Sequence, residues 1–328
     1  MQQRRALVTG AGGFIGHHLV ARLKEEGFWV RGVDIKYPEF EETYADEFTI
    51  LDLREMTNCI RAVVSMHDIY QLAADMGGIG YITSKLASIA RNNALINLNM
   101  LEATRMMQGS IPRRYFYTSS ACIYPQHMQL ANAIIGGLKE EYAYPADPEP
   151  GYGWEKLFSE QLSQYYANDY RLQVRIARFH NIYGPMGTYE GGKEKSPAAI
   201  CRKVAKAENG GEIEVWGDGQ QTRSYCYIDD CITGIRKLME SSYTPPLNIG
   251  TEELVTVDQL VHYVSAAAGK GLRIKHTASK PQGVRGRNSD NTNMRAALHW
   301  EPQIKLEVGI KKTYEWILSQ IQRKQERM

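Results

Sequence analysis

A glycine-rich turn near the start of the chain constrains its fold more than any other feature. Residues 5–9 form a short apolar segment that predicts a strand, and Gly10, Gly13 and Gly16 follow it with the spacing G-x-x-G-x-x-G. From residue 15 onward, apolar side chains recur with the period of a helix. A strand, a glycine turn and a helix in this order are typical of dinucleotide-binding folds. The glycines let backbone N–H groups approach a pyrophosphate and let the helix pack closely on the strand.

An acidic residue at the end of the next expected strand narrows the kind of dinucleotide. Residues 29–34 end in Asp34, eighteen positions after Gly16, close to the spacing at which a carboxylate hydrogen-bonds the adenosine ribose. A carboxylate there repels a 2′-phosphate, so the sequence favours NAD over NADP. Lys36 stands nearby and weakens this preference slightly.

Strand and helix patterns alternate along the first half of the chain. Further expected strands cover residues 47–52, 68–74, 113–121 and 173–181, and expected helices cover 56–64 and 85–107. This alternation predicts an α/β fold, a Rossmann-type doubly wound parallel sheet with a smaller, discontinuous C-terminal substrate domain.

The second half of the chain is expected to divide between the two domains. The NAD-binding domain is expected to take residues 1–182 plus about 222–250, and the substrate domain about 183–221 plus 251–328. Residues 224–228 are expected to return briefly to the sheet, and residues 314–321 to form a closing amphipathic helix.

Composition excludes several classes of function. A net charge of +2 over 328 residues gives no case for nucleic acid binding. No apolar run reaches the roughly 18–20 residues that would cross a membrane. Five cysteines without paired spacing indicate neither a metal site nor a disulfide framework. The first residues run into a strand without the apolar region of a signal peptide, so we expect a cytoplasmic protein.

The strand expected at 113–121 ends in hydroxyl groups and a thiol. Ser119, Ser120 and Cys122 would stand at the rim of the sheet, where side chains are held rigidly. About thirty residues later, Tyr152 and Lys156 lie four positions apart and therefore on one face of a helix. An ammonium near a phenol lowers the pKa of the phenol, which would make Tyr152 a usable base.

The Y-x-x-x-K pattern occurs at two other places in the chain. Tyr189 and Lys193 enclose two glycines, which argues against a helix, and Tyr81 and Lys85 have no serine-bearing strand before them. The pair that follows Ser120 is therefore the best candidate for catalysis.

Several stretches together resemble one known family over essentially the whole chain. They are residues 9–16 (TGAGGFIG), 72–78 (LAADMGG), 119–125 (SSACIYP), 178–185 (RFHNIYGP), 216–219 (WGDG), 221–224 (QTRS) and 283–290 (GVRGRNSD). They resemble the extended short-chain dehydrogenase/reductase superfamily and, within it, the GDP-mannose 3,5-epimerase family.

The resemblance implies inversion of a GDP-hexose at C3 and C5. GDP-mannose would become GDP-L-galactose, with GDP-L-gulose as a further product, and a tightly bound NAD would oxidise C4 and then be recycled. The resemblance assigns the chemistry at C4 to Tyr152, Lys156 and Ser120. It gives Cys122 and Lys195 to proton transfer on opposite faces of the ring, which requires a thiol tuned towards thiolate and an ammonium able to lose its proton.

The resemblance also assigns the binding residues and the assembly. The resemblance and the glycine turn together imply these cofactor contacts: Gly10, Gly13, Phe14, Ile15, Gly16, Asp34, Asp52, Leu53, Tyr152 and Lys156. The substrate contacts it implies are Gly80, Ser120, Ala121, Cys122, Asn181, Glu194, Lys195, Ser196, Lys203, Gln221, Thr222, Arg223 and Arg287. A homodimer formed through the helix at 85–107 and the helix that begins near Gly151 is expected.

Other functions remain open at the level of the sequence. A GDP-fucose synthase-like epimerase/reductase would use NADPH and a histidine, whereas this chain has Asp34 and Lys195. A 4,6-dehydratase needs a carboxylic acid beside its strand-tip hydroxyl group, and the neighbours of Cys122 offer none. A simple 4-epimerase would leave Cys122 without a role. A nucleotide-sugar or NAD sensor would share the fold without the chemistry.

Overall fold

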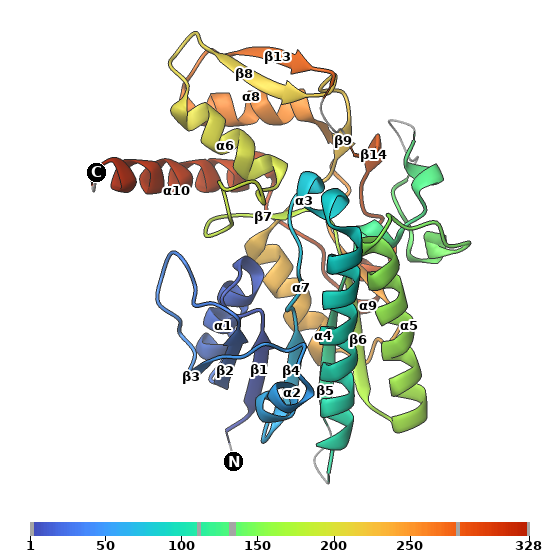
Figure 1. Ribbon diagram of the computed structural model, residues 1–328. Coiled ribbons are helices and arrows are strands. Elements are labelled where there is room, and N and C mark those ends of the chain that lie inside the picture. Colours follow the sequence, from blue (N-terminus) through green and yellow to red (C-terminus); the bar gives the residue numbers. More distant parts are fainter. Residues whose placement is uncertain (1–2, 110–112, 131–135, 280–282, 327–328) are drawn as a thin grey trace.

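The computed structural model describes residues 3–109, 113–130, 136–279 and 283–326, and a seven-stranded parallel sheet dominates it (Figure 1). The strands follow the order β11-β6-β5-β4-β1-β2-β3 across the sheet. Their bounds are β1 (Arg5–Thr9), β2 (Trp29–Asp34), β3 (Glu47–Ile50), β4 (Asp68–Gln71), β5 (Arg114–Ser120), β6 (Gln173–Phe179) and β11 (Leu247–Ile249). This order reverses between β1 and β4, which is where ligands bind in doubly wound sheets.

Helices cover both faces of this sheet, as parallel strands joined by right-handed crossovers require. They are α1 (Phe14–Glu25), α2 (Met56–Val63), α4 (Leu86–Met106), α5 (Tyr152–Tyr170) and α7 (Ile228–Glu240). Side chains pointing to opposite faces enter separate apolar clusters: Ala6 and Val8 pack in one, and Leu7 packs in the other. The sequence-based prediction of the fold class is therefore confirmed.

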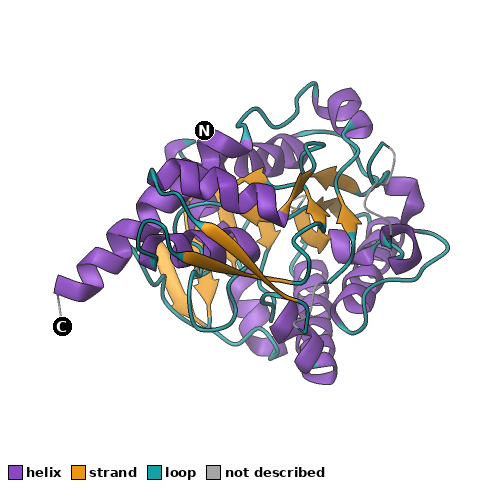
Figure 2. Ribbon diagram, turned by 90° about the horizontal axis from the view of Figure 1, so that it is seen from above, coloured by secondary structure: helices purple, strands orange, loops and turns teal. Residues whose placement is uncertain are grey.

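A smaller part stands above the carboxyl ends of the large sheet (Figure 1). It contains α6 (Ser196–Lys206), α8 (Val257–Ala268), α10 (Leu306–Glu326), β8 (Glu212–Trp216) and β13 (Arg273–Thr277). Strands β8 and β13 pair in parallel, and α6, α8 and α10 pack on one another. Seen from above, this small sheet and its helices cross over the large one (Figure 2).

Short elements connect the two parts. They are α3 (Ile79–Ser84), α9 (Thr292–Leu298), β7 (Ile182–Tyr183), β9 (Thr222–Arg223), β10 (Cys226–Tyr227), β12 (Val255–Thr256), β14 (Gly286–Arg287) and the 3₁₀ turns η1 (Ala121–Ile123), η2 (Gln126–Gln129) and η3 (Glu140–Ala143). Strand β9 pairs with both β12 and β14, which ties residues 222–223 to residues 286–287.

Some expected elements differ from those observed. The closing helix was expected at 314–321, but α10 begins at Leu306 and ends at Glu326, because the apolar side chains of Leu306 and Ile310 extend its buried stripe. The segment 224–228 does not join the large sheet. Its strand β10 pairs with β7, and β11 supplies the last strand of the large sheet.

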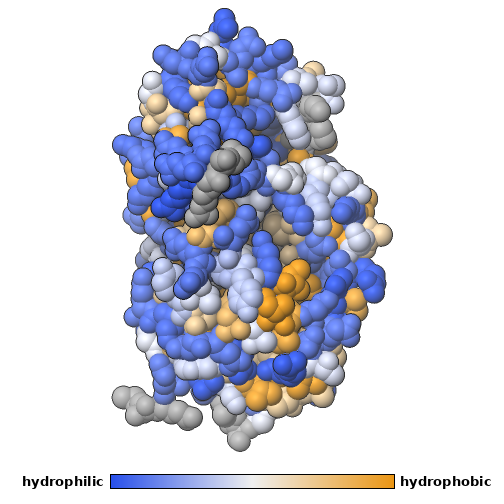
Figure 3. Space-filling view, turned by 60° about the vertical axis from the view of Figure 1, so that its left-hand side comes forward, coloured by the Kyte–Doolittle hydropathy of each residue, from blue (hydrophilic) through white to orange (hydrophobic). Residues whose placement is uncertain are grey.

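Among the described helices, none is both long and apolar enough to cross a bilayer. On the face shown in Figure 3 most side chains are hydrophilic, and the hydrophobic ones gather mainly in the lower half, which holds the large sheet.

Candidate active site

The glycine turn forms a cradle at the carboxyl end of β1. A Cβ atom added at Gly16 would lie 2.1 Å from the carbonyl oxygen of Gly10, so only glycine allows α1 to start this close to the strand. Asp34 closes the other side: its Oδ2 accepts the Gly12 N–H at 2.9 Å and its Oδ1 accepts the Ile35 N–H at 2.7 Å. Burial raises the pKa of Asp34, and these N–H donors oppose the rise. A bare backbone beside an acid at a strand end fits a dinucleotide with a free ribose diol.

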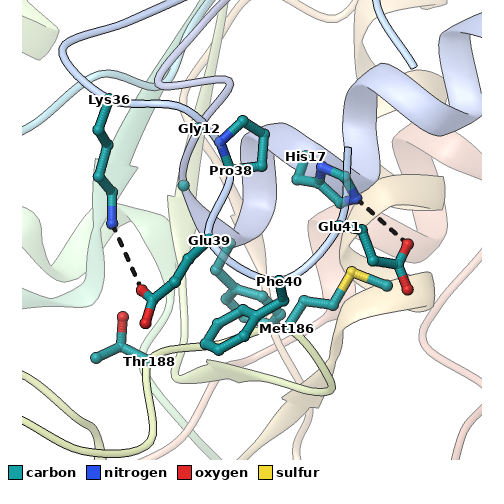
Figure 4. A pocket seen from close by; sticks show the side chains of 11 residues that line it. Gly12, His17, Lys36, Pro38, Glu39, Phe40, Glu41, Met186 and Thr188 are labelled. Carbon is teal, nitrogen blue, oxygen red and sulfur yellow. Dashed lines mark ion pairs between the residues drawn. The ribbon is translucent and has the colours of Figure 1, made fainter. Parts of the chain in front are cut away.

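The segment that follows β2 folds over this cradle and leaves a cleft of about 30 Å³ (Figure 4). In the figure, Lys36 points toward Glu39 and His17 toward Glu41, each pair 3.9 Å apart. Lys36 is therefore directed at Glu39, a residue of its own segment. Asp34 remains the acidic group placed to bind the ribose.

Two expected cofactor residues lie further along the same sheet edge. The side chain of Asp52 is held by Arg54, whose Nη2 donates to Oδ2 at 2.6 Å. Leu53 is 3% exposed and packs in the core. Its side chain therefore has a packing role, and only its backbone is placed to meet a ligand.

Tyr152 and Lys156 occupy the first turn of α5, as the spacing predicted. The Lys156 ammonium lies 5.7 Å from the centroid of the Tyr152 ring and donates to the carbonyl oxygen of Thr118 at 2.9 Å. The side chain of Ser120, at the end of β5, lies close enough to Tyr152 to oppose part of the rise in its pKa. The predicted catalytic serine, tyrosine and lysine therefore meet at one point.

The electrostatics of this trio differ from the sequence-based expectation. Burial raises the pKa of Tyr152 well above its usual range, and burial lowers the pKa of Lys156. The predicted lowering of the tyrosine pKa by Lys156 is therefore outweighed. The reason is desolvation: a phenolate buried in an apolar cluster with Ile82 and Ile89 lacks the water that would stabilise it.

Cys122 lies in η1, directly after β5, and its backbone is fixed on both sides. Its N–H donates to Ser120 Oγ at 3.2 Å, and its carbonyl oxygen accepts the Glu149 N–H at 3.0 Å. A Cβ atom at Gly153 would lie 2.4 Å from that carbonyl oxygen, so glycine is needed for α5 to approach η1. The thiol accepts a hydrogen bond from Arg287 Nη1 at 3.4 Å.

The protonation of Cys122 also departs from expectation. Burial raises the pKa of the thiol, and the Arg287 guanidinium partly opposes the rise. This direction is opposite to the tuning towards thiolate that the resemblance requires.

Lys195 caps the amino end of α6 and faces the same cavity as Cys122. By exposed area the Lys195 side chain is open to the solvent of this cavity. The walls of the cavity still desolvate the ammonium and lower the pKa of Lys195, while the neighbouring Cys122 opposes the fall. The expectation that Lys195 can shed its proton is thus supported.

These residues line one cavity of about 370 Å³ between the large sheet and the smaller part. Of the predicted substrate residues, all but Thr222 line it, namely Gly80, Ser120, Ala121, Cys122, Asn181, Glu194, Lys195, Ser196, Lys203, Gln221, Arg223 and Arg287. Thr222 lies in β9, behind the lining, and its carbonyl oxygen accepts a hydrogen bond from Arg223.

Two arginines give the cavity a positive wall. Arg223 donates to the carbonyl oxygen of Val284 at 2.6 Å, and Arg287 donates through Nε to Gln129 Oε1 at 2.5 Å. Burial lowers the pKa of Arg223 to about 10, and the charge of Arg287 adds to this effect. Two neighbouring guanidinium groups held by neutral partners favour an anionic ligand such as a diphosphate.

Three kinds of lining residue were not predicted from the sequence. Glu149 lines the cavity and its charge raises the pKa of the Cys122 thiol, although it comes from a proline-rich linker with no recognisable motif. Trp216, at the end of β8, lies in one of the stretches that carry the resemblance, but the resemblance assigns it no role. Met76, Ile79 and Ile82 form an apolar wall that only the packing of α3 reveals.

A tyrosine with a lysine one turn away, beside a dinucleotide cradle at the edge of a parallel sheet, is the arrangement of short-chain dehydrogenase/reductase enzymes, and it defines the class of this protein. A more specific assignment comes from residues 6–250, which match the NAD dependent epimerase/dehydratase family. The chain belongs to that family.

Curated relatives agree with the resemblance seen in the sequence. The chain is 45% identical over 318 residues to GDP-mannose 3,5-epimerase of Arabidopsis thaliana, covering 96% of this chain and 82% of the relative. It is 44% identical over 324 residues to GDP-mannose 3,5-epimerase 1 of Oryza sativa subsp. japonica, covering 98% and 84%. UDP-glucuronic acid decarboxylase 5 of A. thaliana is more distant, at 28% identity over 323 residues, covering 93% and 87%. The predicted family resemblance is confirmed.

Solved structures share the fold. UDP-glucose 4-epimerase of Thermotoga maritima, solved with UDP-glucose, superposes with a TM-score of 0.86 at 24% identity, covering 97% of this chain and 99% of the other. The UDP-glucose 4-epimerase of Thermus thermophilus in complex with NAD gives 0.82 at 22% identity, covering 95% and 98%.

Proposed function

We propose that this chain is an NAD-dependent nucleotide-sugar 3,5-epimerase, which inverts a GDP-hexose at C3 and C5 and converts GDP-mannose to GDP-L-galactose and GDP-L-gulose. The observation that carries the proposal is that Cys122 and Lys195 line the same cavity as Tyr152. The relatives at 44 and 45% identity that bear the name GDP-mannose 3,5-epimerase support it.

The residues around the glycine turn would hold the cofactor. Gly10, Gly13, Phe14, Ile15 and Gly16 would hold the pyrophosphate, and Asp34 would bind the ribose diol. The backbone near Asp52 and Leu53 would complete the cofactor site at this edge of the sheet. When bound, NAD supplies a reversible hydride acceptor for C4 and a positive charge that favours a phenolate nearby.

Tyr152 acts at C4. It takes the proton of the C4 hydroxyl group, and Ser120 holds that hydroxyl group through a hydrogen bond. Lys156, anchored on Thr118, keeps a positive charge within 5.7 Å of the Tyr152 ring. After both inversions Tyr152 returns the same proton, so the residues at C4 end in their starting state.

Cys122 and Lys195 act at C3 and C5. A ketone at C4 acidifies the hydrogens on both neighbouring carbons, because the resulting carbanion is stabilised as an enediolate. Inversion removes a proton from one face and adds one to the other, so the two residues must hold one proton between them. The directions of the two shifts, a lowered pKa for Lys195 and a raised pKa for Cys122, favour such a state, and both side chains line one cavity.

The remaining contacts orient the nucleotide. Arg223 and Arg287 neutralise the diphosphate, and Asn181, Glu194 and Ser196 border the sugar. Lys203 and Gln221 lie at the wall built by β8. Gln221 Oε1 is buried without a hydrogen-bond partner, so it is an available acceptor for a donor on the base.

We also propose a homodimer built on α4 and α5, which pack side by side (Figure 1). Leu98 on α4 is 43% exposed, and Trp154, Phe158 and Tyr165 on α5 are 51, 55 and 56% exposed. Large apolar side chains gathered on neighbouring helices favour a protein partner. Light scattering should give twice the mass of the chain, and Phe158→Glu should give the monomer. A monomeric wild-type chain at micromolar concentration would contradict the dimer.

We retain the division into a cofactor domain, residues 1–182 plus about 222–250, and a substrate domain, about 183–221 plus 251–328, and a cytoplasmic location. The route of the chain supports the division, since β11 (Leu247–Ile249) returns to the large sheet after β8 has formed in the smaller part.

The test is incubation of the purified chain with GDP-mannose and no added cofactor, with the sugar products identified by NMR. The proposal predicts GDP-L-galactose and GDP-L-gulose. Turnover only with added NADPH would favour an epimerase/reductase, loss of water a dehydratase, and a C4 epimer a 4-epimerase. Binding of GDP-mannose or UDP-glucose without any turnover would favour a sensor.

A further inference from the structure

The segment that carries Lys195 is held from within mainly through Glu194, whose carboxylate accepts the Gly192 N–H at 2.7 Å and pairs with Arg202 at 2.8 Å. Gly191 and Gly192 adopt φ angles of +90° and +86°, and a Cβ atom added at either would have no atom within 4 Å. Two unpacked glycines in this conformation form a natural hinge. Among the described residues, no hydrogen bond or ion pair fixes the Lys195 ammonium itself, so its position depends on the backbone of residues 193–195.

That backbone rests on the loop before α3. The Gly78 N–H donates to the carbonyl oxygen of Lys193 at 3.0 Å. A Cβ atom at Gly78 would lie 2.6 Å from the carbonyl oxygen of Glu194, so the two segments touch main chain to main chain. This contact gives one hydrogen bond, and a second attachment comes from side chains.

The second attachment is an aromatic ring under a cation. The Lys193 ammonium lies 4.1 Å from the centroid of the Tyr81 ring, within the range of a favourable cation–π contact. Lys85 approaches the same ring at 5.2 Å. The ring of Tyr81 packs against Gly77, where an added Cβ atom would lie 3.0 Å from the Tyr81 Cβ.

Tyr81 is in turn anchored to the long helix α4. Its hydroxyl group donates to Asp75 Oδ1 at 2.8 Å. Asp75 accepts a hydrogen bond from Asn92 Nδ2 at 3.0 Å, and its backbone exchanges hydrogen bonds with the Asn93 side chain at 2.6 and 3.1 Å. Hydrogen bonding to Asp75 raises the pKa of Tyr81, so the hydroxyl group stays a donor.

We propose that Tyr81 is a positioning residue for Lys195: its ring, anchored by Asp75, holds Lys193 and so keeps Lys195 facing Cys122 across the cavity. Gly192, Glu194 and Lys195 line the cavity, whereas Tyr81 and Lys193 stand behind that lining. Tyr81 therefore acts on the reaction through the Lys195 segment and not through the substrate. This role rests on the proposed function of Lys195.

The test compares two steps of one reaction in the full-length chain at saturating GDP-mannose. Deuterium incorporation at C3 and C5 in D₂O needs Lys195, whereas reduction of the bound cofactor by substrate, followed by its absorbance, needs only Tyr152 and its neighbours. Tyr81→Leu and Lys193→Gln should each slow ring exchange about tenfold or more, since small misplacements of a reacting group have effects of this size. Cofactor reduction should stay within about twofold of wild type.

Conservative variants provide the matched controls. Lys193→Arg keeps a cation over the ring and should exchange at nearly the wild-type rate, and Tyr81→Phe, which keeps the ring, should lose less than Tyr81→Leu. Lys193 is exposed, so its variants test the contact even where a Tyr81 variant folds poorly. Wild-type exchange rates in both Tyr81→Leu and Lys193→Gln, or an equal loss of both steps, would overturn the positioning role. A wild-type chain without ring exchange would instead overturn the proposed function.

Discussion

The guanidinium group of Arg287 donates a hydrogen bond to the thiol of Cys122 at 3.4 Å, although 165 positions separate them in the chain. Burial raises the pKa of this thiol, and Arg287 is the main charge that opposes the rise. The small ladder of β9 with β14 places Arg287 here, because it joins residues 286–287 to the strand that carries Arg223. A ladder that connects the two parts of the molecule therefore contributes directly to the pKa of a residue that follows the large sheet.

Replacing Arg287 should change the pH dependence of the reaction. The reaction requires that one of Cys122 and Lys195 carries a proton and the other does not. Activity is therefore lost at low pH, where both are protonated, and at high pH, where both are deprotonated. Because a cation lowers the pKa of the thiol, Arg287→Gln should raise that pKa and move the alkaline limb of kcat to higher pH by on the order of one unit. Arg287→Lys keeps a charge and should move it less. An unchanged alkaline limb in Arg287→Gln would show that the thiol does not titrate in this range.

Removing the Tyr152 hydroxyl group should stop the reaction before the ring carbons are touched. Tyr152→Phe should lower turnover by about 10²- to 10⁴-fold, the usual contribution of a general base. Deuterium exchange at C3 and C5 should fall equally, because neither hydrogen is acidic without the C4 ketone. Tyr189→Phe, in another Y-x-x-x-K copy, is the matched control and should leave turnover unchanged. Normal ring exchange in Tyr152→Phe would contradict the order of steps.

A buried ion pair under the active site should govern stability. Arg178 donates to Glu160 at 2.8 Å, with side-chain exposures of 4 and 0%, and Glu160 also accepts from Ser119. Arg178→Ala leaves an unpaired buried carboxylate and should lower the free energy of unfolding by about 3–5 kcal/mol. Urea denaturation measures this loss. The double variant Arg178→Met/Glu160→Leu removes both charges and should recover much of it. Equal losses in the single and double variants would contradict this explanation.

Local chemistry made part of the site predictable from the sequence. The glycine turn and Asp34 obey spacing rules of one βαβ unit, and Tyr152 with Lys156 obeys the period of a single helix. Cys122 could be placed because it directly follows a strand. These features depend on short segments whose geometry is set by nearby residues.

The remaining features of the site depend on tertiary packing and could not be predicted from the sequence. The contact of Arg287 with Cys122 depends on β9 and β14, each two residues long, which carry no periodic signal. The raised pKa values of Tyr152 and Cys122 result from burial in the folded chain, which no sequence pattern shows, so the predicted direction was the opposite one. The pairing of Cys122 with Lys195 came from family resemblance, because no rule of spacing relates a strand tip to a residue some seventy positions away.

The most direct test of the central claim is site-resolved deuterium incorporation from D₂O into GDP-mannose, followed by NMR for wild type and Cys122→Ala. The account predicts that wild type incorporates deuterium at both C3 and C5. Cys122→Ala should lose this exchange at both carbons while it keeps its fold and its bound cofactor. Exchange at a normal rate in Cys122→Ala, or none in wild type, would contradict the account.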